Sequence, residues 1–328
     1  MKTRRLLAAA AFATTLFHGL EAPAQTTESY PNRALRLIVP NAPGGASDFT
    51  ARIIQQPWSE QFGQQVVIDN RGGAAGNIAL ETVARSTPDG YTLLIASNTQ
   101  AINPSIYPKF PYRPLEHLIP ITQVADIPGS LVVHPSMPVK SVKELVAYGK
   151  ANPGKLNYGS PSPSSANRLA MEIFMRHTGT KFGHVPYKGG SGPMLIALVA
   201  NEVNLAFATF SSTVNFAKQD RLRMLGVIAP ERLSAMPDVP TMPELGFKDL
   251  GTGTWMGIFV TRGTPTPSGK RIYEVATKSV EQPDVIKRFT VAGTRPVVSR
   301  SPEAFRAFVK SETDNYAVVV KEAGITAD

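Results

Sequence analysis

Short apolar runs alternate along the chain with loops rich in glycine, serine or asparagine, and these loops lead into amphipathic segments. The apolar run at residues 35–39 predicts a buried strand, and the segment at 47–62 predicts the helix that follows it. Two further strands are predicted at 65–69 and 91–96, with a helix at 77–86 between them. This alternation of strands and helices predicts a parallel sheet that is covered by helices on both faces.

The same pattern continues beyond residue 120, and its order indicates two α/β lobes joined by crossing strands. Further strands are predicted at 130–134, 156–159, 203–208, 222–228 and 255–261, and further helices at 141–150, 166–177, 267–282, 283–292 and 302–323. Ser141 is expected to cap the first of these helices, with Glu144 closing a capping box. Because strand 255–261 is expected to return to the first lobe, we assign residues 25–126 and 255–328 to lobe 1 and residues 127–254 to lobe 2.

Residues 1–24 have the composition of a cleavable signal peptide. Three basic residues precede an apolar stretch at 6–20, and Ala22-Pro23-Ala24 has the small-x-small pattern of a cleavage box. The Arg4-Arg5 pair leaves twin-arginine export open beside the general secretory route. No later run of about 18 apolar residues occurs, so no transmembrane helix is predicted in the mature chain. The sequence therefore predicts an exported protein.

Cysteine content and charge narrow the kinds of site that the mature protein can carry. The chain has no cysteine, which excludes a disulfide framework, a cysteine zinc site, a thiol nucleophile and a lipid-modified cysteine anchor. Loss of Lys2, Arg4, Arg5 and Glu21 with the signal peptide would reduce the formal net charge from +9 to +7. A positive surplus favours anionic ligands. The charges are dispersed, without an arginine-rich run, so no nucleic-acid partner is predicted.

Loops that follow a strand and open a helix are the candidate anion sites of this chain. The loops at 40–48, 70–76 and 160–165 have this placement and are rich in small residues. Backbone N–H groups at a helix N-terminus are unpaired within the helix and favour negative charge, so such a loop binds anions without a charged side chain. Gly44-Gly45 would let a ligand approach the backbone closely. Asp48, in the first turn of the helix, is interpreted as a partner of the helix dipole or a cap.

Catalytic, nucleotide and metal motifs are absent from the sequence. The loop at 72–76 does not match G-x-G-x-x-G, and neither a P-loop nor a G-x-S-x-G elbow occurs. His117, His134, His177 and His184 have no metal-ligand spacing. We therefore predict no catalytic residue, no metal and no cofactor. Ser164 and Ser165 start a predicted helix, which leaves both capping and ligand binding open for them. A hydrolase that uses either serine is an alternative, but the sequence places no histidine to activate it.

Motifs along the whole mature chain resemble the Bug, or tripartite tricarboxylate transporter, family of periplasmic substrate-binding proteins. In lobe 1 they are Tyr30-Pro31, Leu37-Ile38-Val39-Pro40, Pro43-Gly44-Gly45-Ala46-Ser47-Asp48, Asn70-Arg71, Gly76-Asn77, Pro88-Asp89-Gly90-Tyr91-Thr92-Leu93-Leu94 and Ile102-Asn103-Pro104. In lobe 2 they are Ser141-Val142-Lys143-Glu144-Leu145, Asn152-Pro153-Gly154-Lys155-Leu156-Asn157-Tyr158, His184-Val185-Pro186-Tyr187-Lys188-Gly189-Gly190 and Pro237-Asp238-Val239-Pro240-Thr241.

The resemblance implies an α/β fold of the periplasmic binding protein type II-like, or Venus-flytrap, class, in which two α/β lobes enclose a ligand cleft. In this family lobe 1 holds a carboxylate through water molecules that backbone groups position, and lobe 2 grips the other end of the ligand. The implied ligand-binding residues are Ala42, Gly44, Gly45, Ala46, Ser47, Ser97, Asn98 and Thr99 in lobe 1, and Ser160, Ser164, Ser165, Asn167, Arg168, Ala208, Thr209 and Phe210 in lobe 2.

Three positions bear on which ligand the resemblance implies. The family often has an acidic residue where Ala208 stands, so an amino-acid ligand is less expected here. Arg168 stands where the family often has histidine, and it either forks onto a carboxylate or covers the solvent-facing surface of its helix. Phe210 adds a candidate aromatic wall. Together with Ala208 it suggests an aromatic dicarboxylate such as terephthalate or phthalate, beside the alternative of a citrate-like acid.

The same resemblance implies a function and a location. The protein is expected to be a periplasmic, monomeric receptor that captures a small carboxylate and delivers it to the membrane subunits of a tripartite tricarboxylate transporter. It is not expected to be an enzyme. The alternative is an extracytoplasmic sensor that presents a carboxylate to a membrane signalling kinase. The sequence does not separate these two kinds of partner.

Overall fold

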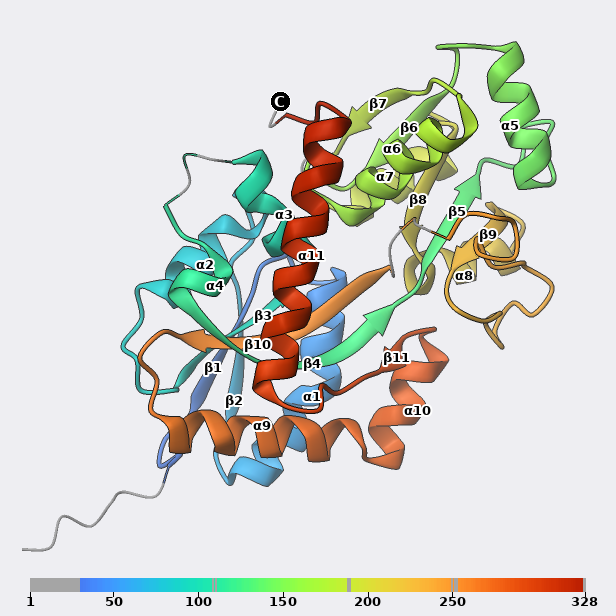
Figure 1. Cartoon of the computed structure of the whole chain (residues 1–328). Helices are drawn as coiled ribbons and strands as arrows, with labels where there is room; N and C mark the ends of the chain where they lie inside the picture. The colour runs from blue at the N-terminus through green and yellow to red at the C-terminus, as the bar shows by residue number, and fades with distance from the viewer. Residues whose placement is uncertain are drawn as a thin grey trace, which may run out of the picture.

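Two β-sheets organise the protein, one in each half of the molecule (Figure 1). The computed structural model describes residues 30–107, 109, 111–187, 190–248, 250 and 253–326. The predicted signal peptide lies outside the described residues, so it stays a prediction.

The first sheet has six strands in the order β11-β4-β10-β3-β1-β2. Its strands are β1 (Leu35–Val39), β2 (Val66–Asn70), β3 (Thr92–Ser97), β4 (Leu118–Ile127), β10 (Thr254–Thr261) and β11 (Arg295–Pro296). Strand β1 pairs in parallel with β2 and β3, whereas β10 is antiparallel to β3 and β4. The expected parallel sheet is therefore a mixed sheet. The reason is that β10 returns from the second sheet in the direction opposite to β4.

Helices cover both faces of the first sheet. One face carries α1 (Ala46–Phe62), α9 (Thr266–Val280) and α10 (Pro283–Val291), and the other carries α2 (Asn77–Ala84), α3 (Asn98–Ile106) and α11 (Pro302–Glu322). Two short helices, η1 (Ala74–Gly76) and α4 (Pro114–His117), lie in the connections. Side chains of β1 alternate between the two faces: Leu37 packs with Trp58 of α1, and Ile38 joins the cluster that contains Phe305 of α11. Each face thus has its own apolar core.

The second sheet has five strands in the order β7-β6-β8-β5-β9. Its strands are β5 (Gly129–Val133), β6 (Asn157–Ser160), β7 (Gly183–Pro186), β8 (Leu205–Thr209) and β9 (Arg223–Ile228). Strand β6 is parallel to β7 and β8, and β5 is antiparallel to β8 and β9, so this sheet is also mixed. Its helices are α5 (Val142–Ala151), α6 (Ala166–Thr178), α7 (Ser191–Val199) and α8 (Phe210–Lys218).

The chain crosses between the sheets from β4 to β5 and returns from β9 to β10. The expectation that strand 255–261 returns to the first lobe is confirmed, because β10 lies between β3 and β4. Helix α6 contacts both lobes: Leu169 packs with the core of α3 and α11, while Met171 and Phe174 pack with the core of the second sheet. Each sheet draws its strands from one of the predicted lobes, and the exact lobe boundaries stay a prediction.

The predicted strands and helices occur within a few residues of their expected positions, but several elements were not predicted. They are η1, α3, α4, α7, α8, β4, β7 and β11. The capping box at α5 is also incomplete. Ser141 Oγ accepts a hydrogen bond from Glu144 N at 3.2 Å, as expected, but Glu144 Oε2 accepts from Lys140 N at 2.6 Å instead of from the N-cap residue.

Candidate ligand-binding site

The loop between β1 and α1 presents Ala42 and Gly44 to solvent, with Gly45 and Ala46 half-buried. Ser47 is buried, and its hydroxyl contacts Met256 Sδ on β10 at 3.4 Å, so this side chain points into the protein. The loop therefore offers backbone groups and small side chains to a ligand.

Asp48 fixes the conformation of this loop. Its carboxylate accepts hydrogen bonds from Gly44 N at 2.9 Å, from Asn70 Nδ2 at 3.0 Å and from Arg52 Nε at 2.8 Å. Burial acts to raise the pKa of Asp48, but the hydrogen bonds from Arg52, Gly44 and Asn70 outweigh it and hold the pKa below its usual value. Asp48 is 2% exposed. These contacts confirm its interpretation as a structural residue of the helix start.

The β3–α3 turn is built as a capping box. Ser97 Oγ accepts from Thr99 N at 3.3 Å, and Gln100 Oε1 accepts from Ser97 N at 2.8 Å. Thr99 is half-buried, whereas the Asn98 side chain is directed inward and is 1% exposed. Asn98 Nδ2 donates to Gly253 O at 2.8 Å. The contribution of Asn98 to a ligand in this state is thus limited to its backbone.

The glycine loop between β2 and α2 holds the other two loops of lobe 1 together. A methyl group on Gly72 would lie 3.2 Å from Ala42 N, and one on Gly76 would collide with the amide of Gln100. Only glycine allows this approach, and Gly76 also has a φ of 80°, in the left-handed region. The three loops at the carboxyl ends of β1, β2 and β3 therefore form one continuous surface.

The serine loop of lobe 2 follows β6 and opens α6. Ser165 Oγ accepts from Arg168 N at 3.2 Å, so Ser165 is the N-cap of the helix. Ser164 Oγ is buried beside the phenol of Tyr107 and makes no well-aligned hydrogen bond with a described residue. Asn167 is half-buried. Of the two serines, Ser164 is the one whose hydroxyl is left for another partner.

Ser160 is held by a histidine that sequence analysis gave no role. Its Oγ donates to Ser162 O at 3.0 Å and lies 2.7 Å from His184 Nε2. The hydroxyl of Ser160 is therefore engaged on two sides, by Ser162 O and by the ring of His184. The contact follows from the parallel pairing of β6 with β7, and no sequence motif predicts the register of that pairing. This geometry gives no support to the hydrolase alternative.

Arg168 is buried, which corrects the interpretation that it covers a solvent-facing surface. The residue is 8% exposed, and its Nη1 lies 3.4 Å from Pro163 O and 3.5 Å from Thr326 O. Its Nε lies 3.8 Å from Glu172 and has no hydrogen-bond partner among the described residues. The guanidinium therefore lies between α6 and the end of α11 with long, weak contacts.

The β8–α8 turn supplies Ala208, Thr209 and Phe210, all of them buried. Thr209 Oγ1 lies 2.8 Å from Ser212 Oγ. A methyl group on Gly293, just after α10, would collide with the ring of Phe210. The Phe210 ring is therefore packed across the lobes, and its role as an aromatic wall stays a prediction.

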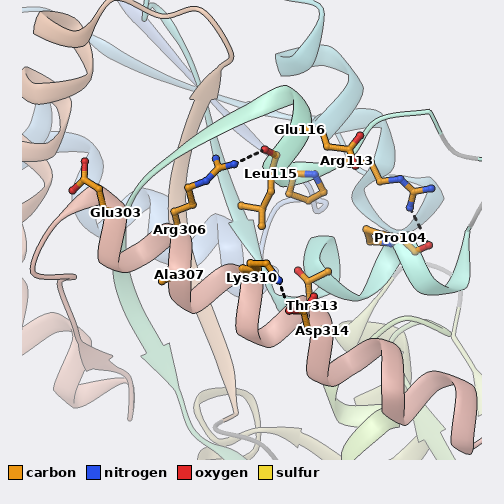
Figure 2. Close-up of a pocket in the computed structure, with 11 residues that line it drawn as sticks. Pro104, Arg113, Leu115, Glu116, Glu303, Arg306, Ala307, Lys310, Thr313 and Asp314 are labelled. Carbon is orange, nitrogen blue, oxygen red and sulfur yellow. Dashed lines mark hydrogen bonds and ion pairs between the residues drawn. The ribbon is translucent and has the colours of Figure 1, made fainter.

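A separate groove lies on the outer side of lobe 1, between α4 and α11 (Figure 2). Its volume is about 500 Å³, and it contains none of the predicted ligand-binding residues. Three of its charged side chains are engaged with the protein: Arg306 Nη2 donates to Leu115 O at 3.3 Å, and Lys310 pairs with Asp314 at 2.6 Å. Among the described residues, no group of three His, Cys, Asp or Glu side chains is arranged to hold a metal ion.

Comparison with known families decides the class of this protein. The family model described as the tripartite tricarboxylate transporter family receptor matches residues 50–325. The chain belongs to this family. The tripartite tricarboxylate transporter receptors are periplasmic solute-binding receptors and not enzymes, which confirms both the expected family and the expected absence of catalysis.

Individual members share the sequence and the fold over nearly the whole chain. BugT of Bordetella pertussis is 32% identical over 308 residues, which cover 93% of this chain and 94% of BugT. The structure of Rpa4515 from R. palustris with adipate has a TM-score of 0.85 and 32% identity, and covers 90% of this chain and 99% of that one. MatC from Rhodopseudomonas palustris with bound malate has a TM-score of 0.81 and 29% identity, with coverages of 89% and 100%. The two-lobed type II-like fold is thereby confirmed.

A final observation concerns membrane attachment. Within the ranges that the structure describes, none of the helices of this receptor is both long enough and apolar enough to cross a membrane.

Proposed function

We propose that this receptor captures a small dicarboxylate between its two lobes and delivers it to the membrane subunits of a tripartite tricarboxylate transporter. Lobe 1 consists of residues 25–126 and 255–328, and lobe 2 of residues 127–254. The ligand stabilises the closed arrangement because it contacts both lobes only when they are together. The closed receptor then presents the surface that the membrane subunits bind.

The observation that carries this proposal is the repeated placement of helix N-termini. Helices α1 and α3 in lobe 1 and α6 and α8 in lobe 2 each begin at the carboxyl end of a strand. Each N-terminus directs backbone N–H groups toward a bound anion. The acidic side chain at these starts, Asp48, is engaged by Gly44, Asn70 and Arg52. Backbone N–H groups of the two lobes can thus bind the two ends of one dicarboxylate.

An aliphatic dicarboxylate is the ligand class that we favour. Rpa4515 and MatC, the two similar receptors, are described with adipate and with malate. Ala208 provides no carboxylate that would bind a ligand amine, which disfavours amino acids. The aromatic hypothesis rested on Ala208 and Phe210 together, and Phe210 is occupied by packing against Gly293. Terephthalate, phthalate and citrate are therefore the alternative ligands to be tested against the aliphatic dicarboxylates.

Export to the periplasm and a monomeric state complete the proposal. Residues 1–24 act as the signal peptide, and the absence of cysteine leaves the mature receptor without a lipid-modified cysteine anchor. We propose a monomer because all of the candidate ligand-binding loops described above belong to one chain.

Isothermal titration of the mature receptor tests the ligand class, with adipate compared with hexanoate and adipamide. Hexanoate keeps one carboxylate, and adipamide keeps the length without charge. We expect adipate or malate to bind, and hexanoate to bind at least tenfold more weakly, because one lobe then loses its charge-assisted hydrogen bonds. Equal affinity for adipate and adipamide contradicts a carboxylate site. If terephthalate binds and neither adipate nor malate does, the ligand class is an aromatic dicarboxylate.

Co-purification from detergent-solubilised membranes tests the partner. Tagged receptor saturated with its ligand should retain transporter subunits, and ligand-free receptor should retain them less. Retention of a sensor kinase instead would assign the receptor to signalling.

A further inference from the structure

The side chain of Asn98 connects a proposed ligand loop to the crossing between the lobes. Asn98 is the first residue of α3, directly after the N-cap Ser97. Its Nδ2 donates to Gly253 O at 2.8 Å and lies 3.4 Å from the hydroxyl of Tyr316. Gly253 directly precedes β10, the strand that returns from lobe 2. The backbone and the side chain of one residue therefore face two different parts of the molecule.

Gly253 lies where the two interlobe connections touch. A methyl group on Gly253 would collide with Ile127 O and would lie 3.1 Å from Gly129 N. Ile127 ends β4 and Gly129 begins β5, so this is the outgoing crossing. The φ of Gly253 is 94°, which a residue with a side chain rarely adopts. The residue that accepts the hydrogen bond from Asn98 is thus the one at which the outgoing and returning crossings pack against each other.

Helix α11 completes the same hydrogen-bonded unit. The hydroxyl of Tyr316 donates to Glu312 Oε2 at 2.6 Å, and Trp255 Nε1 donates to the same oxygen at 3.2 Å. Trp255 follows Gly253 by two residues on β10 and is paired with Asp126 on β4. Asn98, the start of β10 and α11 are therefore joined through consecutive hydrogen bonds. Asn98, Trp255 and Tyr316 are buried, and Gly253 and Glu312 are half-buried.

We propose that Asn98 is a positioning residue that couples the β3–α3 loop to the hinge between the lobes. The coupling rests on the proposed function, in which that loop contacts the ligand. When the loop adjusts to a ligand, the amide of Asn98 moves the carbonyl of Gly253 with it and shifts the relative position of the two crossings. In the ligand-free protein the same hydrogen bond restrains the range of lobe angles.

The test compares N98A with T261V. Thr261 lies at the opposite end of β10, and its hydroxyl donates to a buried backbone carbonyl, Val83 O, at 2.7 Å. Each substitution removes one side-chain hydrogen bond to a carbonyl and one contact with a neighbouring hydroxyl, that of Tyr316 for Asn98 and that of Ser86 for Thr261. Both variants are therefore expected to have a lower melting temperature. Only N98A removes the connection to the hinge.

Two measurements need no ligand. Hydrogen exchange should be faster in N98A at residues 127–133 and 254–257, and small-angle scattering should give a larger radius of gyration than for the unmodified protein. T261V should match the unmodified protein in both. Equal exchange in N98A and T261V at these residues, with unchanged scattering, overturns the proposal. The less drastic N98S should show the same changes to a smaller extent and serves if N98A does not fold.

Titration with adipate and malate as probes provides the third measurement. We expect N98A to weaken binding on the order of tenfold, which corresponds to a loss of about 1.4 kcal/mol from the closed state. Affinity in N98A equal to that in T261V contradicts the coupling. Failure of the unmodified protein to bind either probe would contradict the proposed ligand class, and the exchange and scattering results would still decide the role of Asn98.

Discussion

The ring of Phe210 in lobe 2 packs directly against the backbone of Gly293 in lobe 1. Phe210 is fully buried at the start of α8, and a methyl group on Gly293 would overlap the ring atoms Cδ1 and Cε1. Gly293 follows α10 with a φ of 66°. An aromatic side chain that lies at the edge of the proposed ligand site therefore closes a contact between the lobes.

Substitution G293A should destabilise the protein and weaken ligand binding. The left-handed backbone conformation costs alanine roughly 1–2 kcal/mol, and the added methyl group also displaces the Phe210 ring. Displacement of the ring also removes this contact between the lobes, so we expect the affinity to fall as well. Thermal unfolding and titration with adipate measure the two effects.

Gly63 supplies the matched control for this prediction. It also ends a helix, with a φ of 67°, and no described atom lies within 4 Å of a methyl group built on it. G63A should carry the backbone cost alone and leave the affinity unchanged. If G63A and G293A lower the melting temperature equally and neither changes the affinity, the contact between Phe210 and Gly293 has no role in closure.

We expect Arg168 to bind the ligand carboxylate, because its guanidinium makes only long contacts within the protein. Its hydrogen bonds to Pro163 O and Thr326 O are 3.4 and 3.5 Å long, and Nε has no partner among the described residues. R168M keeps most of the apolar stem and removes the charge. We expect adipate binding to weaken by roughly 10- to 100-fold, the effect of losing hydrogen bonds to a charged group, and stability to fall as well, because Glu172 loses its ion-pair partner.

The comparison with R176M separates ligand binding from helix packing. Arg176 lies on the same helix and forms a half-exposed ion pair with Glu322 at 2.8 Å. Such a pair contributes little to stability, so R176M should leave both affinity and unfolding nearly unchanged. Loss of stability in R168M without any loss of affinity would make Arg168 a packing residue between α6 and α11.

Ser164 and Ser165 are adjacent and should respond in opposite ways to replacement by alanine. Ser165 caps α6 through Arg168 N at 3.2 Å, so S165A should lower the free energy of unfolding by about 1 kcal/mol. Ser164 Oγ is buried without a well-aligned hydrogen bond among the described residues, so S164A should cost little stability. Instead, S164A should weaken adipate binding. Denaturant unfolding and titration of both variants measure this, and equal affinities in S164A and the unmodified protein would exclude Ser164 from the site.

The alternation of strands and helices could be predicted because it depends mainly on residues that are close together in the sequence. The run at 35–39 and the glycine loop after it needed no knowledge of distant residues, and Asp48 was correctly assigned to the helix start from its position alone. The direction of β10 and the partners of Asn98 and Phe210 could not be predicted. Asn98 and Gly253 are 155 residues apart, and their contact depends on how the lobes are joined.

The candidate site shows the same limit. Loop composition indicated which segments could bind an anion, but it did not distinguish inward from outward side chains. The family resemblance placed Ser47, Asn98 and Phe210 at the ligand, and the structure directs all three side chains into the protein. The role of His184 was missed because it follows from the register of β6 and β7.

Asp126 is a buried carboxyl group near the end of β4, beside the crossing to lobe 2. Its Oδ2 lies 3.4 Å from Arg295 Nη1, and Oδ1 has no hydrogen-bond partner among the described residues. Burial raises the pKa of Asp126 from 3.8 to about 6, the charge of Glu312 adds to this rise, and Arg295 opposes it. The desolvation of the carboxylate therefore outweighs its ion pair.

Substitution D126N should increase stability at neutral pH and have little effect near pH 4. The pKa of Asp126 is raised in the folded state, so between pH 4 and 6 the folded state binds more protons than the unfolded state, and stability falls as the pH rises through this range. The difference between 3.8 and about 6 corresponds to roughly 3 kcal/mol at pH 7.5, part of which asparagine should recover. Denaturant unfolding at pH 4.5 and 7.5 measures the change.

D69N should behave oppositely at pH 7.5, because hydrogen bonds from Arg36 and Arg71 lower the pKa of Asp69 against the effect of burial. A D126N variant that is destabilised at pH 7.5 would show that the ion pair with Arg295 outweighs the cost of burying the charge.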